Sequence, residues 1–188
     1  MMQSKQRGTA ERNFRRCGAT LGMLSSLLIA APATAQATPA PLPLLPLPAT
    51  ITRTADSITI ANGAGVAVPS GDAEAEAAAR LLIAQVATTR GLTLRTTSTG
   101  AVIRFVRDPA IVGAEAYRLT ADASGIRIAA SARGGFVYGA MTLAQLLSPD
   151  QAFGKPATVP GVDISDAPRF AWRGVMVDVA RHFQPLPS

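Results

Sequence analysis

The chain has 188 residues, of which 48% are hydrophobic, 16% charged and 5% aromatic, and its formal net charge is +6. This composition favours a folded globular protein over an intrinsically disordered one. The length allows one ordinary domain with additional segments. It excludes a complete (β/α)8 barrel enzyme, because that fold alone needs roughly 250 residues.

The excess of positive charge lies near the N-terminus. Residues 1–35 hold five basic residues and Glu11, whereas the rest of the chain holds 13 basic and 11 acidic residues without a basic run. A nucleic-acid-binding protein concentrates its positive charge on its folded part. We therefore expect no nucleic-acid partner.

Residues 1–35 have the order of a signal peptide. A basic stretch precedes the apolar residues 20–31, and Ala33-Thr34-Ala35 supplies the small-x-small pattern after which signal peptidase cleaves. The apolar run of about a dozen residues is shorter than the ~20 that a spanning helix needs. We expect cleavage near Ala35, export to the periplasm or the exterior, and no stable membrane insertion afterwards. Arg15-Arg16 leaves a twin-arginine route open beside the general one.

The mature chain would contain no cysteine, because Cys17 lies within the signal peptide. Disulfides, thiol nucleophiles and cysteine metal sites are thereby excluded. Residues 36–50, QATPAPLPLLPLPAT, are Pro-rich and without periodicity. They predict a semi-rigid linker between the cleavage site and the fold.

Residues 51–160 predict a small α+β domain. Residues 57–60 alternate as a strand does, and acidic residues then open a helix over residues 72–90 that ends at Gly91. Residues 101–106 form a β-rich run, and residues 117–122 and 126–128 predict a β-hairpin. A second helix is expected to end at Ser148-Pro149. The expected fold class is α+β, with a small antiparallel sheet and helices on one face.

No catalytic motif stands out in this domain. Gly134-Gly135 is not followed by the Lys-Ser/Thr of a phosphate loop, so it predicts a tight turn. The acidic residues of the first helix predict a solvated face rather than a metal site. The domain is therefore interpreted as a support or interaction domain.

The C-terminal segment carries the most specific pattern. Residues 163–170 are polar and turn-prone, whereas residues 174–179 are almost continuously apolar, which is typical of a strand buried on both faces. Arg181 and His182 follow this strand, at the end where α/β barrels place their active sites. An arginine there can donate paired hydrogen bonds to vicinal hydroxyls or a carboxylate. The alternative is a structural ion pair between Asp178 and Arg181.

Residues 166–183, DAPRFAWRGVMVDVARHF, resemble the start of the catalytic barrel in family 20 glycoside hydrolases, the β-N-acetylhexosaminidases. Segments at residues 115–119, 126–128 and 135–147 are similar to the N-terminal α+β domain of that family. The resemblance implies two parts, residues 51–160 as this domain and residues 161–188 as the first strand of a truncated (β/α)8 barrel. It also implies an exported enzyme that removes terminal non-reducing β-linked N-acetylhexosamine from a carbohydrate substrate, without a metal or cofactor.

The same resemblance implies roles for individual residues. Arg181 matches the arginine that binds the 3- and 4-hydroxyls of the terminal sugar, and Arg173 and Asp178 match structural supports; His182 has no catalytic counterpart. The family is retaining and uses the 2-acetamido group of its substrate as the nucleophile, assisted by an Asp-Glu pair. This chain contains no Asp-Glu dipeptide. We therefore expect the catalytic pair beyond residue 188 and an inactive N-terminal fragment.

Two other readings stay open. One is a complete, non-catalytic secreted module that binds glycans or a partner protein. The other is a related glycosidase with a similar N-terminal domain, such as an α-glucuronidase.

Overall fold

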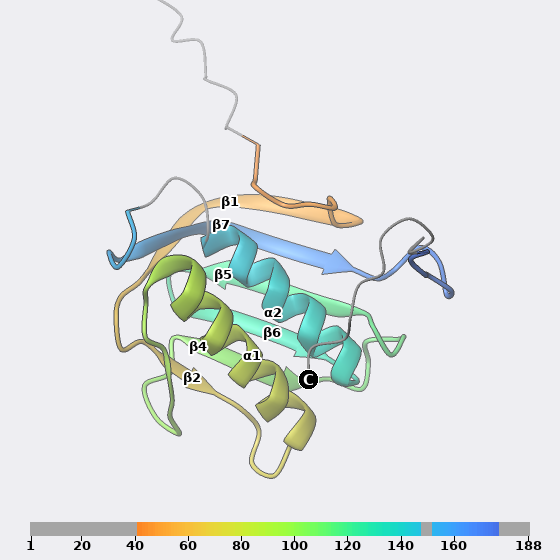
Figure 1. The fold of residues 1–188 in the computed structure, drawn as a ribbon, viewed down its shortest axis with the longest axis horizontal. Helices are drawn as coiled ribbons and strands as arrows, with labels where there is room; N and C mark the ends of the chain where they lie inside the picture. The colour runs from red at the N-terminus through yellow and green to blue at the C-terminus, as the bar shows by residue number, and fades with distance from the viewer. Residues whose placement is uncertain (1–40, 148–151, 177–188) are drawn as a thin grey trace, which may run out of the picture. The chain divides into compact units, whose positions relative to one another are not determined.

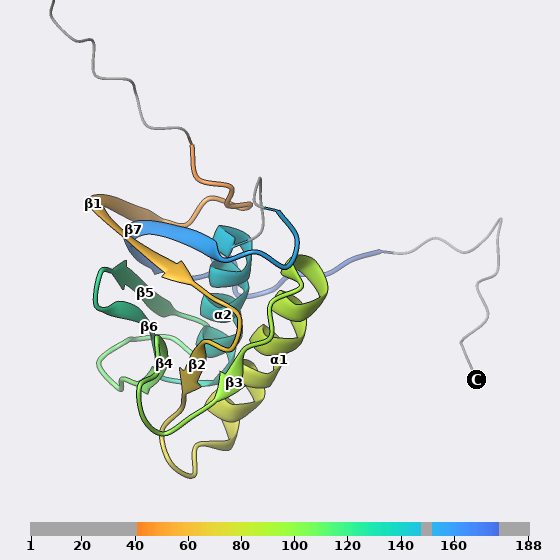
Figure 2. The same ribbon diagram turned by 90° about the vertical axis from the view of Figure 1, so that its left-hand side faces the viewer.

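The computed structural model of the protein describes residues 41–147 and 152–176, so the expected signal peptide lies outside the described residues. A seven-stranded sheet carries two helices on one of its faces (Figure 1). Figure 2 shows both helices on the same side of the strands. In chain order the elements are β1 (Thr50–Ile60), β2 (Gly65–Ala67), α1 (Ala73–Arg90), β3 (Arg95–Thr96), β4 (Ile103–Arg107), β5 (Tyr117–Asp122), β6 (Gly125–Ala130), α2 (Arg133–Leu147) and β7 (Ala157–Asp166).

The α+β class and the helices on one face are confirmed, but the expectation of an antiparallel sheet is wrong for half of the strand pairs. The strand order is β1-β7-β5-β6-β4-β2-β3. The pairs β1/β7, β7/β5 and β5/β6 are antiparallel, whereas β6/β4, β4/β2 and β2/β3 are parallel. The pairs β2/β3 and β4/β2 are parallel because α1 crosses over from β2 to β3 and β4, and a helical crossover returns the chain in its original direction. The pair β6/β4 is parallel because β5 runs back antiparallel to β6, which then lies between β5 and β4.

The first helix matches its prediction closely. The Oδ1 atom of Asp72 accepts a hydrogen bond from the backbone N–H of Ala75 at 3.0 Å, which caps the helix N-terminus. Gly91 ends the helix in the left-handed conformation, with φ of 64°, and its N–H bonds to the carbonyl of Ala87 at 3.0 Å. Ala75, Ala78, Leu82 and Val86, spaced three or four positions apart, form the apolar face of the helix and are fully buried against the rest of the domain.

The second helix packs unusually close to the sheet. Gly134 and Gly135 lie inside α2 rather than in the expected tight turn. A Cβ added to Gly135 would overlap the carbonyl oxygen of Ala116, and one added to Gly139 would lie 2.6 Å from Cγ2 of Ile128. The glycines are therefore needed for the close approach of α2 to β6 and to the chain before β5.

Strand β7 crosses the domain boundary expected at residue 160. It lies between β1 and β5, with Val159, Val162 and Ile164 buried in the core. Residues 163–166 are thus part of the sheet and not of a turn. Gly161 within this strand faces a bulge of β1, where the register shifts between Arg53 and Ser57. The folded domain therefore extends at least to Asp166.

The Pro-rich stretch is not a free spacer where the structure describes it. Residues 42–49, here called the strap, lie against α2 and the end of β7. Leu44 is only 6% exposed. The N–H of Leu45 donates to Oε1 of Gln145 at 2.8 Å, and Nε2 of Gln145 donates to the carbonyl of Leu45 at 3.1 Å. The linker expectation is therefore wrong for these residues, because one side chain of α2 pairs with both backbone groups of Leu45.

The expected barrel strand lies largely outside the described residues. Its first three residues, 174–176, are described and are not in a strand, and Val175 and Met176 are exposed. Within the described part of the chain, no helix is both long enough and apolar enough to cross a membrane.

Candidate functional site

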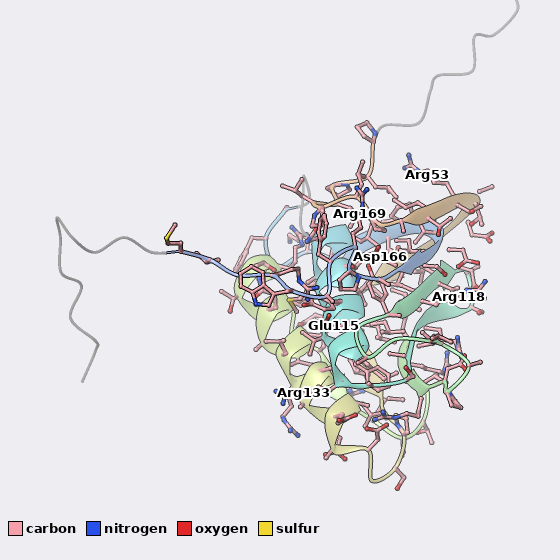
Figure 3. All side chains as sticks on the ribbon, turned by 90° about the vertical axis from the view of Figure 1, so that its right-hand side faces the viewer. Arg53, Glu115, Arg118, Arg133, Asp166 and Arg169 are labelled. Carbon is pink, nitrogen blue, oxygen red and sulfur yellow. The ribbon has the colours of Figure 1, made fainter. Side chains whose placement is uncertain are left out.

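An apolar groove of about 330 Å³ runs along α2, between the strap and the residues that follow β7. We call it the α2 groove. Figure 3 shows Glu115, Asp166 and Arg169, three of its polar lining residues, along this side of the domain. Its apolar lining comes from Leu44, Leu45, Pro46, Pro48, Met141 and Phe170. The surface is therefore suited to apolar side chains of a macromolecule more than to a polar small molecule.

Tyr117 and Thr142 contribute a hydrogen-bonded pair to the lining of the groove. Their hydroxyl oxygens lie 2.6 Å apart, and the Tyr117 hydroxyl is 3.5 Å from Oδ2 of Asp166. Burial, with the nearby Asp166 carboxylate, raises the pKa of Tyr117 to about 12. The phenol is therefore neutral at physiological pH and acts here as a hydrogen-bonding group rather than as an acid or base.

Asp166 connects the last strand to the strap. Its Oδ1 atom accepts a hydrogen bond from the backbone N–H of Ala49 at 3.0 Å. Because Asp166 is the last residue of β7 and Tyr117 is its partner across the sheet, this carboxylate stands where three segments meet. It helps to fix one wall of the α2 groove.

Residues 167–176, here called the tail, are tied to the domain through Arg173. Its Nη2 atom donates to Oε1 of Glu115 at 2.7 Å and to the Tyr138 hydroxyl at 3.2 Å, while its Nη1 atom donates to the carbonyl of Phe170 at 2.6 Å. The hydrogen bonds that Arg173 donates to Glu115 and Tyr138 raise the pKa of its guanidinium, which stays charged. These contacts suit the structural role predicted for Arg173, which stays a prediction.

The tail presents apolar side chains to solvent beside the groove. Phe170, Val175 and Met176 are exposed, and Trp172 is 85% exposed. A contiguous exposed apolar surface on a folded domain marks an interaction site more often than a random feature. Phe170 belongs both to the tail and to the lining of the α2 groove, so exposed apolar groups of the tail begin at the groove.

The acidic residues of α1 remain accessible to solvent, as expected, since the side chains of Glu74 and Glu76 are 48% and 43% exposed; the capping residue Asp72, in contrast, is 11% exposed. Arg107 pairs with Asp72 at 2.6 Å and with Glu74 at 2.9 Å. In residues 41–147 and 152–176, no group of three or more His, Cys, Asp and Glu side chains is arranged to hold a metal ion. The predicted substrate-binding Arg181 and the predicted support Asp178 lie outside the described residues.

Sequence reasoning missed the residues that organise this surface. Glu115, Tyr138, Gln145 and Asp166 are ordinary polar residues in their local sequence, and each bonds to a segment far along the chain. The Leu45–Gln145 contact, for example, joins residues 100 positions apart. No local pattern signals such a contact.

Comparison with protein families gives a match over nearly the whole described fold. The model for domain 2 of glycosyl hydrolase family 20 matches residues 42–167. The match begins at the strap and ends one residue after β7. The matched region includes the strap, which the sequence predicted to be part of a linker. It also includes all of β7, although the domain was expected to end at residue 160.

Curated relatives share the same family resemblance over part of their length. A beta-hexosaminidase from Akkermansia muciniphila is 49% identical over 71 residues, which are 38% of this chain and 14% of the relative. A beta-hexosaminidase from Vibrio furnissii is 51% identical over 71 residues, 38% of this chain and 11% of the relative. The chain thus matches only a small part of these proteins.

Solved structures resemble the described fold. A GH20 exo-β-N-acetylglucosaminidase from Vibrio harveyi, in complex with N-acetylglucosamine, has a TM-score of 0.68 and 34% identity over 77% of this chain and 22% of its own. A Streptomyces plicatus N-acetyl-β-hexosaminidase has a TM-score of 0.68 and 34% identity over 80% of this chain and 31% of its own. Both are longer proteins in which this fold is one part.

Proposed function

The chain belongs to glycosyl hydrolase family 20, and from this membership we propose that it is the N-terminal supporting part of a β-N-acetylhexosaminidase. The observation that carries the proposal is the extent of the family match. It covers residues 42–167, so the strap, the sheet and both helices correspond to one named domain of that family. The two curated relatives described above are beta-hexosaminidases, and this chain covers 14% and 11% of their lengths.

The apolar surface of the domain is consistent with a domain that packs against a catalytic part. The α2 groove is lined mainly by apolar side chains, and the tail leaves the domain beside it with Trp172 exposed. In a longer protein these apolar groups would be removed from water by the polypeptide that follows the tail, which is favourable at roughly 25 cal/mol per Å² buried. The domain would then act as a platform for the catalytic part.

The proposed reaction is hydrolysis of terminal β-linked N-acetylhexosamine with retention of configuration. The acetamido oxygen of the substrate attacks the anomeric carbon while a glutamate protonates the leaving oxygen, and an aspartate orients the acetamide; the family is an exception to the two-carboxylate scheme. Neither member of that Asp-Glu pair is assigned to a residue of this chain. Arg181 would bind the sugar, because its planar guanidinium matches two vicinal hydroxyls.

We also propose export through the N-terminal signal peptide, with cleavage near Ala35. The support is the order of a basic stretch, an apolar run and Ala33-Thr34-Ala35 in the sequence. After cleavage only a few residues would precede the strap. N-terminal sequencing of the protein recovered from outside the cytoplasm tests this, and a start at Met1 or Met2 would contradict it.

A hydrolysis assay tests the proposed function. The 188-residue chain and a longer polypeptide that continues through the Asp-Glu pair are each purified and supplied with an aryl N-acetyl-β-glucosaminide. The longer polypeptide is expected to release the aryl group and the 188-residue chain is not. Turnover by the purified 188-residue chain, or its absence from a folded longer polypeptide, would overturn the proposal.

A further inference from the structure

Three side chains from separate segments meet at the base of the tail. Glu115 belongs to the connection before β5, Tyr138 to α2, and Arg173 to the tail. Besides the two bonds from Arg173, the Tyr138 hydroxyl donates to Oε1 of Glu115 at 3.1 Å. The three polar groups thus form a closed triangle, which we call the latch.

The latch joins the tail to the domain by hydrogen bonds. The sheet ends at Asp166, and the described tail residues beyond it form no strand. In residues 167–176, Arg173 is the side chain that hydrogen-bonds to the helices or to the connection before β5. The other terminal nitrogen of Arg173, Nη1, donates to the carbonyl of Phe170 and so connects two residues of the tail. One guanidinium therefore fixes both the shape of the tail and its attachment.

The exposure of the latch argues that it contributes little to overall stability. The side chains of Arg173 and Glu115 are 41% and 38% exposed. Ion pairs this accessible to water and salt generally stabilise a fold only slightly. The hydrogen bonds nevertheless fix the orientation of the Arg173 side chain, because two of its guanidinium nitrogens donate to three acceptors.

We propose that Glu115 and Tyr138 are positioning residues that hold Arg173 and so set the direction in which the chain leaves the domain toward Arg181. This inference rests on the proposed function for the role of Arg181. It assigns to two residues of the supporting domain a part in orienting the substrate-binding segment, through Arg173.

The test uses Trp172, which is the only tryptophan in the chain and the neighbour of Arg173. Time-resolved fluorescence anisotropy of the whole 188-residue chain reports how freely its indole moves. Glu115→Ala is expected to increase the amplitude of the fast, local depolarisation about twofold, because Arg173 loses its charged acceptor. Glu115→Gln keeps an acceptor oxygen and is expected to give a smaller increase, and Tyr138→Phe likewise. The urea midpoint of unfolding is expected to stay within the error of the wild-type value.

Glu76→Ala is the matched control, because it removes a carboxylate from an exposed ion pair with Arg80, at 3.8 Å on α1. It is expected to leave the anisotropy unchanged. A wild-type anisotropy in Glu115→Ala, or equal increases in Glu115→Ala and Glu76→Ala, would overturn the inference about the latch. The measurement needs no hydrolysis, so its failure is distinguishable from failure of the proposed function, which the aryl-glycoside assay reports.

Discussion

Asp72 and Arg107 join the start of α1 to the end of β4 through a two-point ion pair. The Nε atom of Arg107 lies 2.8 Å from Oδ2 of Asp72, and its Nη2 atom lies 2.6 Å from Oδ1. The Asp72 side chain is 11% exposed, and it also caps α1. The guanidinium carbon of Arg107 stands 5.0 Å from the centre of the Phe136 ring in α2. This pair therefore links both helices to the sheet.

Replacing Asp72 is expected to destabilise the domain. Asp72→Ala removes a helix cap, worth about 1 kcal/mol, and a charge-assisted pair of similar size, so we expect a loss of about 2 kcal/mol in the free energy of unfolding. Urea denaturation followed by circular dichroism measures it. Glu76→Ala, in its exposed pair with Arg80, is the control and is expected to change the free energy by less than about 0.5 kcal/mol. Equal effects of the two variants would contradict the role of Asp72.

The same carboxylate predicts a pH dependence. The hydrogen bonds from Arg107 hold the pKa of Asp72 below its ordinary value, and those from Arg118 do the same for Asp163. A group whose pKa is lower in the folded state stabilises the fold above its unfolded pKa, about 3.9 for aspartate, and this contribution is lost as the pH falls through the folded pKa. We therefore expect stability to be nearly constant from pH 7 to 5 and to fall below about pH 4.

Asp72→Asn isolates the contribution of one residue, because asparagine still caps a helix but cannot form the ion pair. The difference in unfolding free energy between the wild type and Asp72→Asn is expected to shrink as the pH falls below about 4. A series of urea titrations between pH 2.5 and 7 measures this difference. A difference that stays constant over the series would show that the ionised carboxylate is not what stabilises the contact.

At Gly135, helix propensity and side-chain packing predict opposite effects of a substitution by alanine on stability. In a helix interior, Gly→Ala ordinarily stabilises by about 1 kcal/mol. Here the added Cβ would overlap the backbone carbonyl oxygen of Ala116, so we expect Gly135→Ala to destabilise by about 2 kcal/mol. Gly139→Ala should cost less, because its Cβ would meet a side-chain atom of Ile128, which can move. Thermal or urea unfolding measures whether the free energy of unfolding falls or rises. A rise for Gly135→Ala would contradict the close approach of α2 to the backbone of Ala116.

The strap offers a matched pair of leucines. Leu44 is 6% exposed and Leu47 is 72% exposed, three positions apart in the same Pro-rich segment. Leu44→Ala is expected to lower the free energy of unfolding by about 2 kcal/mol, and Leu47→Ala by less than about 0.5 kcal/mol. The comparison by urea denaturation separates a packed strap from a spacer. Two equally small losses would restore the linker interpretation of these residues.

Arg181 gives a prediction for the longer polypeptide of the proposed function. Two charge-assisted hydrogen bonds to the sugar hydroxyls are worth about 3 kcal/mol together, so Arg181→Ala is expected to lower kcat/KM by roughly 100-fold. Arg80→Ala, on the exposed face of α1, is the control and should leave kcat/KM unchanged. Steady-state kinetics on an aryl N-acetyl-β-glucosaminide measures both. A wild-type kcat/KM in Arg181→Ala would remove this residue from the sugar site.

Local signals in the sequence account for what could be predicted. Helix α1 carries its cap, apolar face and terminal glycine within its own residues, and the β5–β6 hairpin is joined by a short turn. Both were predicted and are confirmed. Strands β2 and β3 have three and two residues, too few for alternation to be recognised. The parallel pairs β2/β3 and β2/β4 were missed for that reason.

Features that depend on distant partners could not be predicted from local patterns. Pro160 and Gly161 interrupt the apolar alternation of β7, and its burial depends on β1 and β5 on either side. The strap is held by Gln145, and the tail by Glu115 and Tyr138. Only the folded chain brings these residues together. The family resemblance, by contrast, was recognisable from the sequence, because it lies in contiguous motifs.

The most direct measurement for the central claim is the sequence of the transcript through and beyond the codon for Ser188. The proposed function predicts an open reading frame that continues for some hundreds of codons and includes an adjacent Asp-Glu pair. A stop codon directly after Ser188, with no such frame downstream, would contradict it.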